Sequence, residues 1–578
     1  MKLKVYILLL ALAGYSQMAI AQKKSHAKKP VTHAKKAVAK PEKKKVEKQP
    51  KLVDKKVAGK DTSDLKSATI EIVQSYKPEI RVDAKRESVP LLPPVDTATA
   101  NVNYAVPSQS LSYGYFALPL RPLALAKDSA ERSYANYVKI GGGNLSTLLL
   151  DAGIGSVSGK NYGLALRLHH LSQAGKIIDQ KTSLSGLEAD GNYRTSKHVW
   201  NAGLNVSRDV YNLYGFNDVL TVPHTPTQQQ LNNIGIHADM QRINEDTKWI
   251  YHPDVKAFYF AGTSFGSELA ASLHLPLSYA IKENLRFITG LTGAYAHMNQ
   301  SVATPTNSNM AQLLLGVEYN NGPIGFKAIM QPTIGQMNNW YLLPDISASY
   351  NVPRTQLSVF AGWQGTLRQN TLSQLLYVNP YLRYNINALQ QTHIDEVYGG
   401  VKTNIGNHFT VNGKVSWKQY DNMPLMVNDT TAFDAKYFAV TYDKVNTLSF
   451  EGSVRYQMGN LISVGLGASY TSFNTTTQKR AWHEPGLKLN ADLIVHPIPK
   501  LTVTATMAIM DGLYAVDKGN ATVKLKSISD LGFGAEYIFI PRLSGFVQAN
   551  NILNKSYERW YGYQAYGFNI FGGIRLKF

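Results

Sequence analysis

Apolar and polar residues alternate with a period of two along most of the chain after residue 134. In residues 447–456, TLSFEGSVRY, leucine, phenylalanine, valine and tyrosine alternate with serine, glutamate and arginine. This alternation is typical of a β-strand with one apolar and one polar face. The last segment, GFNIFGGIRLKF, keeps the pattern up to the terminal Phe578. The pattern predicts an all-β domain over residues 134–578.

The connections between the alternating segments are short at one end and long at the other. Tight turns lie near Asn321–Gly322, Gly406–Asn407 and Gly459–Asn460, whereas loops such as 368–392 and 421–444 are long and polar. This layout is typical of an outer-membrane barrel with short periplasmic turns and long outside loops. We therefore predict a transmembrane antiparallel β-barrel of about 22 strands, with segments at 135–143, 147–156, 160–172, 182–194, 197–209, 231–243, 252–263, 268–281, 284–298, 309–320, 323–333, 343–352, 355–367, 393–404, 407–420, 445–457, 460–472, 485–496, 499–511, 528–540, 543–554 and 567–578.

Residues 1–21 have the pattern of a secretory signal peptide. Lys2 and Lys4 begin it, an apolar run too short to span a bilayer follows, and Ala19-Ile20-Ala21 forms a cleavage site. The chain contains no Cys, which excludes disulfides, a lipid-bearing cysteine, thiolate zinc sites and thiol catalysis. We expect an exported protein.

The positive charge of the chain is concentrated in residues 22–60. This stretch carries 15 lysines against three acidic residues, a net of +12 out of +20 for the whole chain. A Lys, Ala and Pro-rich segment of this kind cannot bury a core, so we predict a disordered periplasmic tail. An exported tail has no nucleic acid to bind. It either contacts peptidoglycan, lipid headgroups or an acidic periplasmic protein, or is a solvated spacer.

Residues 61–133 form a second non-barrel segment. Seven prolines between Asp61 and Leu123 rule out long helices and central strands. We predict an extended arm, either periplasmic or inside the lumen.

A soluble all-β protein, such as a propeller or a set of sandwiches, is the competing fold. It also predicts strands with one wet face. It does not predict the signal peptide, the alternation of short and long connections and the terminal Phe578 together. The sequence shows no repeat of propeller-blade length either. We therefore prefer the barrel.

The closing residues, NNILNKSYERWYGYQAYGFNIFGGIRLKF, resemble the last hairpin of TonB-dependent receptor barrels. Such barrels carry an Asn-Leu-Phe-Asn-Lys-x-Tyr-like run, an aromatic and glycine-containing loop, and a last strand that ends in Phe. The matching residues here are Asn551, Leu553, Asn554, Tyr557, Trp560, Gly562, Tyr563 and Phe578. The resemblance implies a barrel of 22 strands. It also implies that the barrel assembly machinery reads the terminal strand, through Phe578, Leu576, Ile574 and Phe568.

The resemblance does not extend to the front of the chain. A family member would place a folded plug ahead of the barrel, but only the proline-rich residues 61–133 are available, so we expect a vestigial plug or none. Within them, TIEIVQSY resembles the short sequence that engages TonB, through Glu71, Ile72 and Val73. Any amphipathic strand produces a similar pattern, so this match by itself does not establish uptake energised through TonB.

Charged residues of both signs fall on the predicted inner face of the barrel, namely Glu318, Glu396, Lys402, Lys414, Lys418, Glu451, Arg455, Lys488 and Asp492. They either bind an inserted peptide segment or polar solutes, or form cross-strand ion pairs that brace the wall. A lumen of 22 strands is normally plugged. The arm, outer loops such as 368–392 and 421–444, or another protein must therefore close it.

The sequence gives no support for an enzyme. GTSFG at 262–266 matches the serine-hydrolase pattern, but it falls at the tip of a predicted hairpin and not on a strand-to-helix elbow. HEPGL at His483 lacks the second histidine of a zinc helix. We predict no catalytic residues, no cofactor and no metal site.

These observations favour a porin-like or receptor-like protein in the outer membrane of a Gram-negative bacterium. We expect transport of a solute or macromolecule across that membrane, alone or within a complex, with TonB or another periplasmic protein as a candidate partner. The alternative is a non-transporting structural or assembly component. In that case the basic tail of residues 22–60 ties the barrel to peptidoglycan or to periplasmic proteins.

Overall fold

The computed structural model describes most of the chain after residue 135, namely residues 136–215, 228–243, 248–263, 266–299, 306–383, 389–429, 437–517 and 519–578. The expected signal peptide, the basic tail of 22–60, and the arm of 61–133 with Glu71, Ile72 and Val73 lie outside the described residues. Ser264 of the GTSFG sequence lies outside them too.

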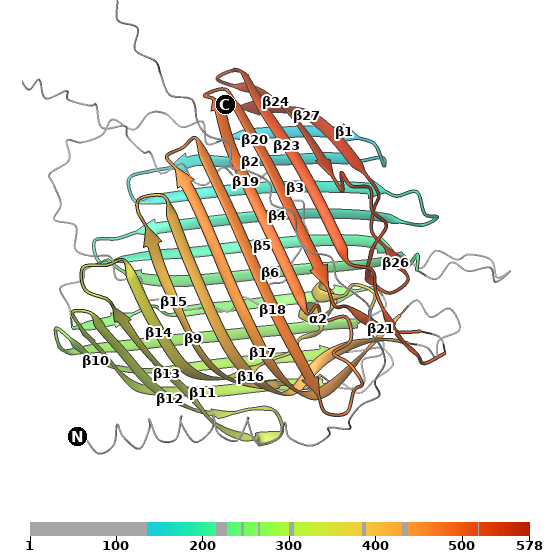
Figure 1. The fold of residues 1–578 in the computed structure, drawn as a ribbon. Helices are drawn as coiled ribbons and strands as arrows, with labels where there is room; N and C mark the ends of the chain where they lie inside the picture. The colour runs from blue at the N-terminus through green and yellow to red at the C-terminus, as the bar shows by residue number, and fades with distance from the viewer. Residues whose placement is uncertain are drawn as a thin grey trace, which may run out of the picture. The chain divides into compact units, whose positions relative to one another are not determined.

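Twenty-two antiparallel strands form a closed barrel (Figure 1). Each strand pairs with the next, and the last strand closes the ring by pairing with the first, from Tyr137 opposite Lys577 to Gly143 opposite Phe571. The strands of the ring are β1 (Tyr137–Gly143), β2 (Leu148–Ser158), β3 (Tyr162–Ala174), β4 (Lys181–Arg194), β5 (His198–Asn212), β6 (Gln228–Arg242), β8 (Asp254–Gly262), β9 (Gly266–Lys282), β10 (Leu285–Asn299), β11 (Thr306–Asn321), β12 (Ile324–Ile334), β13 (Trp340–Asn351), β14 (Leu357–Arg368), β15 (Thr392–Ile405), β16 (Phe409–Asn428), β17 (Phe438–Met458), β18 (Ile462–Thr475), β19 (Leu487–Ile498), β20 (Leu501–Asp511), β23 (Ile528–Ile540), β24 (Leu543–Asn550) and β27 (Asn569–Lys577). The predicted fold class is confirmed, and every predicted segment overlaps one strand of the ring.

Short additional elements lie between the strands of the ring. They are β7 (Trp249–Tyr251), which pairs with β9, the 3-10 helix η1 (Gln336–Asn338), helix α2 (Leu372–Val378), the hairpin β21 (Tyr514–Val516) and β22 (Thr522–Lys524), and the pair β25 (Glu558–Trp560) and β26 (Tyr563–Gln564). In the described part of the chain, no helix is both long and apolar enough to cross a bilayer.

The pattern of side-chain burial in the barrel wall is the reverse of that in a soluble protein, because apolar side chains are exposed and polar side chains are buried. On β16, the outward Val415 and Trp417 are each 45% exposed, whereas the inward Lys414, Ser416 and Lys418 are buried. An apolar outer surface is stable only when lipid covers it, and a closed ring leaves no unpaired strand edge in that lipid. The barrel and its apolar outer face therefore fit the outer membrane of a Gram-negative bacterium.

The structure corrects the prediction of a long polar loop at 421–444. The ladder between β16 and β17 shifts register between Tyr420 and Met423, where Asn422 has a φ of 62°, and then continues to Asn428 opposite Phe438. A bulge kinks a strand without ending its pairing. The strand that continues after the bulge includes the apolar residues Leu425 and Met426, and both side chains are buried.

Candidate functional site

Three tyrosines from three different loops meet at the long-loop end of the barrel. Tyr381 stacks on Tyr563 with ring centroids 3.5 Å apart, and Tyr214 meets the edges of both rings, at 5.1 Å from Tyr563 and 6.2 Å from Tyr381. The Tyr214 hydroxyl donates a hydrogen bond to the Gln564 carbonyl oxygen. We call these residues the tyrosine triad.

The positions of the three loops on the ring place the triad across the mouth of the barrel. Tyr214 follows β5, Tyr381 follows β14 and Tyr563 follows β24, which are the fifth, thirteenth and twenty-first strands of the ring. Loops attached about a third of the ring apart can touch only if they extend inward over the lumen. The triad and the residues packed around it therefore cover the mouth.

We call this covering layer the loop cap, made of residues 213–215, 369–383, 389–391, 476–486 and 551–568 with Phe438. Its centre is apolar and includes the buried residues Leu213, Leu372, Leu376, Leu382, Leu389 and Trp560. Burial of these side chains removes apolar surface from water, which is the main force that holds the layer together. Figure 1 shows α2, one element of the cap, between the front and rear walls of the barrel.

Helix α2 is fixed at its first turn by its own cap and by the barrel wall. The Thr371 side chain accepts a hydrogen bond from the Gln374 backbone N–H, and the Gln374 side chain accepts one from the Thr371 N–H. Glu268 on β9, which is fully buried, accepts the backbone N–H groups of Leu372 and Ser373 at 2.8 and 2.9 Å. A carboxylate at the first turn complements the positive end of the helix dipole.

Phe438 and His483 connect the triad to the other side of the cap. The Phe438 N–H donates to the Tyr381 carbonyl oxygen, and its ring lies 5.5 Å from Trp560. His483 is 1% exposed and packs against both rings. Three loops therefore meet again at this point, which shows that the cap is one continuous layer.

The imidazole of His483 is held in its neutral form. Its Nδ1 donates to the Met426 carbonyl oxygen at 2.8 Å, and its Nε2 accepts the Tyr561 backbone N–H at 3.4 Å. Burial lowers the pKa of this ring from 6.5 to about 3, although the hydrogen bond to Met426 opposes that effect. Protonation would place a charge among aromatic rings and remove the Nε2 acceptor.

The residues that carry the family resemblance build the closing loop. The Asn551 side chain donates to the carbonyl oxygens of Lys555 and Tyr566, and Asn554 Oδ1 accepts the Phe568 N–H. The Tyr557 hydroxyl donates to Asp530 at 2.8 Å.

The aromatic part of the same loop has a second role. Gly562 has a φ of +83°, a backbone conformation that residues other than glycine adopt rarely. The turn that it makes lies between Trp560 and Tyr563. Both aromatic side chains are buried in the loop cap, whereas Leu553 is 47% exposed. Residues of the closing hairpin thus form part of the loop cap as well as the last strand of the barrel.

The terminal strand lies at the seam of the barrel. The Phe578 N–H donates to the Asn136 carbonyl oxygen, and the side chains of Ile574, Leu576 and Phe578 face outward at 47%, 47% and 52% exposure. Phe568, just before the strand, is half-buried. On the inner face, Arg575 Nη1 donates to both carboxylate oxygens of Glu536 at 2.9 Å. A role for these residues as an assembly signal stays a prediction.

Five of the charges expected inside the lumen form ion pairs across neighbouring strands. Glu396 lies 2.6 Å from Lys414 and 3.6 Å from Lys418, and Arg455 lies 3.8 Å from Asp492. Glu318 is in register with Arg286 and Lys327, and Glu451 is in register with Lys414. This pairing favours bracing of the wall over a dedicated solute site.

The other two expected lumenal charges have different surroundings. Lys402 stands opposite Ser358 and Asn412, and Lys488 opposite Ser469 and Met510. The positions directly opposite these two lysines hold neutral side chains.

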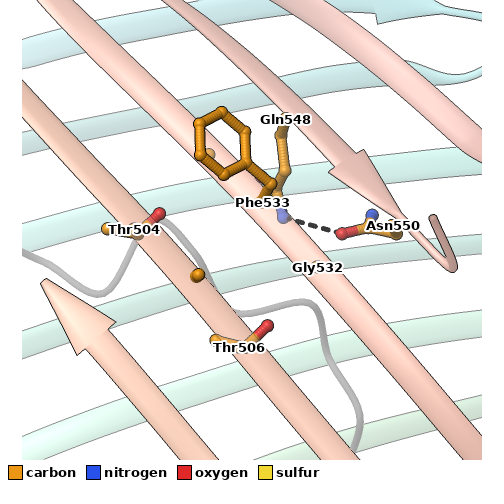
Figure 2. Close-up of a pocket in the computed structure, with 8 residues that line it drawn as sticks. Thr504, Thr506, Gly532, Phe533, Gln548 and Asn550 are labelled. Atoms are coloured by element: carbon orange, nitrogen blue, oxygen red, sulfur yellow. Dashed lines mark hydrogen bonds between the residues drawn. The ribbon is translucent and has the colours of Figure 1, made fainter. Parts of the chain in front are cut away.

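Polar side chains line a small hollow on the inner wall. Figure 2 shows it over β20, β23 and β24, where Gly532 lies beside Thr506 and Gln548 donates to Asn550 at 3.3 Å. Its volume of about 10 Å³ has room for roughly one water molecule. Within the described ranges, no group of three or more His, Cys, Asp or Glu residues is arranged to hold a metal ion.

Several residues of the loop cap were not predicted from the sequence. The polar loop 368–392 contains Thr371-Leu372-Ser373-Gln374 followed by two leucines, a capping-box pattern that signals a helix start. No sequence signal connects Glu268 to this helix, or Tyr214 to Tyr563, because these contacts join residues far apart in the chain.

No protein-family model matches the sequence, and no curated protein matches it either. Solved structures do match the barrel. The pyoverdine outer membrane receptor FpvA from Pseudomonas aeruginosa PAO1 is 12% identical with a TM-score of 0.59, over 77% of this chain and 78% of that one. The FrpB iron transporter from Neisseria meningitidis (F5-1 variant) is 9% identical with a TM-score of 0.61, over 77% and 82% of the two chains.

The siderophore receptor PiuA from Acinetobacter baumannii is 10% identical with a TM-score of 0.55, over 78% of this chain and 82% of that one. The barrel has the fold of TonB-dependent receptors. At this level of identity the likeness concerns the fold alone. The resemblance seen in the closing hairpin is thereby confirmed for the barrel.

Proposed function

We propose that the protein is an outer-membrane transporter that moves a polar solute or a macromolecule through its barrel, with the loop cap as the closure at the long-loop end. The tyrosine triad is the observation that supports this proposal most, because it joins loops from three sides of the ring. Aromatic contacts contribute only about 0.5–1.5 kcal/mol each beyond area burial. Such a cap can open while the hydrogen-bonded wall stays folded.

The structures of similar fold include an iron transporter and receptors for pyoverdine and siderophores, which support transport as the class of activity. We propose that TonB or another periplasmic protein acts on the chain through residues before the barrel. Glu71, Ile72 and Val73 are the candidate contact.

Single-channel conductance of the mature protein in a planar bilayer tests the proposal. Four proteins are compared, with and without residues 22–133, and with and without the double change Tyr381→Ala and Tyr563→Ala. The matched control is Tyr377→Ala, because this tyrosine is on α2 but is 57% exposed. We expect large openings in the protein that lacks both the N-terminal residues and the triad, and none with Tyr377→Ala alone.

Each pattern of conductance has a distinct meaning. Openings after the N-terminal deletion alone would show that these residues, and not the cap, close the barrel. Silence in all four proteins would contradict transport through the lumen. It would favour the structural alternative, a barrel tied by its basic tail to peptidoglycan or periplasmic proteins.

A further inference from the structure

The hydrogen-bond ladder of the barrel wall is weakened around Pro253, between β6 and β9. The ladder between β6 and β8 runs to Asp239 opposite Asp254 and is followed by a hydrogen bond from the Met240 N–H to the Pro253 carbonyl oxygen at 3.1 Å. Beyond Pro253, β7 continues along β9 in the same register as β8. Pro253 separates β7 from β8, and Pro276 lies in the middle of β9 opposite Gly290. Because proline has no N–H to donate, both residues weaken the ladder here.

An apolar groove of about 440 Å³ lies beside this point, lined mainly by Tyr251, Pro253, Leu275, Leu277, Leu291 and Leu313. It opens on the outer face, because Leu291 and Leu313 are 55% and 37% exposed and Tyr251 is in register with Leu277. The groove lies in the half of the wall near the short turns. In an outer-membrane barrel this half meets the periplasmic leaflet.

A cationic side chain lies at the end of the groove near the turns. Arg242, the last residue of β6, follows the outward positions Ile234 and Ile236 in an unbroken register, so it also faces outward. Its guanidinium lies over the Tyr251 ring at 5.7 Å. The Tyr251 hydroxyl in turn lies 2.7 Å from His198 Nε2, which fixes the ring.

The arginine retains unused hydrogen-bonding capacity. Its Nε is buried and has no hydrogen-bond partner among the described residues. An outward guanidinium at the edge of an apolar groove matches a phosphate joined to an acyl chain.

We propose that this groove binds one glycerophospholipid of the periplasmic leaflet, with its phosphate on Arg242 and one acyl chain between β7 and β10. This site is separate from the lumen and from the loop cap. The lipid fills the apolar groove, and a glycerophospholipid of that leaflet supplies both a phosphate and an acyl chain.

Native mass spectrometry of the detergent-purified, delipidated full-length chain tests the site. The probe is palmitoyl-oleoyl-phosphatidylglycerol, compared with palmitoyl-oleoyl-glycerol, which lacks the phosphate, and with lipid A. We expect one retained phosphatidylglycerol per chain, and about tenfold weaker retention after Arg242→Gln, which corresponds to about 1.4 kcal/mol. Arg354→Gln is the matched control, an exposed arginine in the turn between β13 and β14.

A second variant keeps the test valid if Arg242→Gln does not fold. Thr289→Phe places a ring in the groove, and Ala361→Phe places the same ring on the outer face of β14. We expect weaker retention only with Thr289→Phe. Equal retention by all variants, equal binding of palmitoyl-oleoyl-glycerol, or preference for lipid A would each overturn the proposal.

Discussion

At the residue scale, His483 joins three segments of the loop cap through a neutral ring. Its pKa is about 3 in the folded cap, compared with about 6.5 for an open histidine. Between these values the opened state binds the extra proton, so the stability of the closed cap rises with pH across this window. The stabilisation is complete above pH 6.5 and falls by about 1.4 kcal/mol for each pH unit below it.

We therefore expect the cap to loosen in mild acid. Amide exchange in residues 476–486 and 551–568, corrected for its intrinsic pH dependence, should show less protection at pH 5 than at pH 7.5. In His483→Gln, which keeps one donor and one acceptor without titrating, the difference should disappear. His408→Gln, in an exposed turn at the other end of the barrel, is the control. An unchanged pH dependence in His483→Gln would assign the effect to other groups.

At the scale of the elements, β15 and β16 are braced by an ion cluster that is almost fully buried. Glu396 is shared by Lys414 and Lys418, whose side chains are 7% and 6% exposed. Removal of one member of a buried ion pair typically costs about 3–5 kcal/mol, because the remaining charge is left without compensation. Exposed pairs contribute about 0–1 kcal/mol.

We expect Glu396→Gln to lower the free energy of unfolding by about 3 kcal/mol. Asp492→Asn should cost less than about 1 kcal/mol, because the side chains of Arg455 and Asp492 are 56% and 38% exposed. Urea unfolding in lipid vesicles measures both values. Equal losses in the two variants would contradict a difference based on burial.

At the scale of the whole molecule, closure of the ring depends on the pairing of β27 with β1. A closed sheet has no unpaired edge, so unboiled protein in mild detergent should migrate differently from boiled protein on a gel. This shift provides a readout of assembly.

Deletion of Phe578 tests the role of the terminus in that assembly. The side chain is 52% exposed on the outer face, so its loss leaves the inner packing intact. If the terminal aromatic is an assembly signal, as the family resemblance implies, the folded fraction in the outer membrane should fall severalfold while export continues. Phe578→Tyr, which keeps the aromatic ring, should assemble normally. Normal assembly of the deletion variant would remove the special role of this residue.

The sequence by itself determined the wall of the barrel. Each strand needs apolar residues toward lipid and polar residues toward the lumen, so its pattern is local and readable in segments such as 447–456. The alternation of apolar and polar residues did not predict the structure in segments where it was irregular. The polar residues of 421–444 concealed the ladder from Met423 to Asn428, and the capping box at Thr371 was masked by its polar neighbours.

Only the tertiary structure decided how the mouth is covered and where the outer wall carries a groove. The triad joins Tyr214, Tyr381 and Tyr563, and their pairing depends on which strands carry their loops around the ring. Likewise, Tyr251, with Arg242 over its ring, and Leu291 line one groove only because β7, β9 and β10 lie side by side. A strand's faces follow from its own residues, but contacts between loops follow from the closure of the whole sheet.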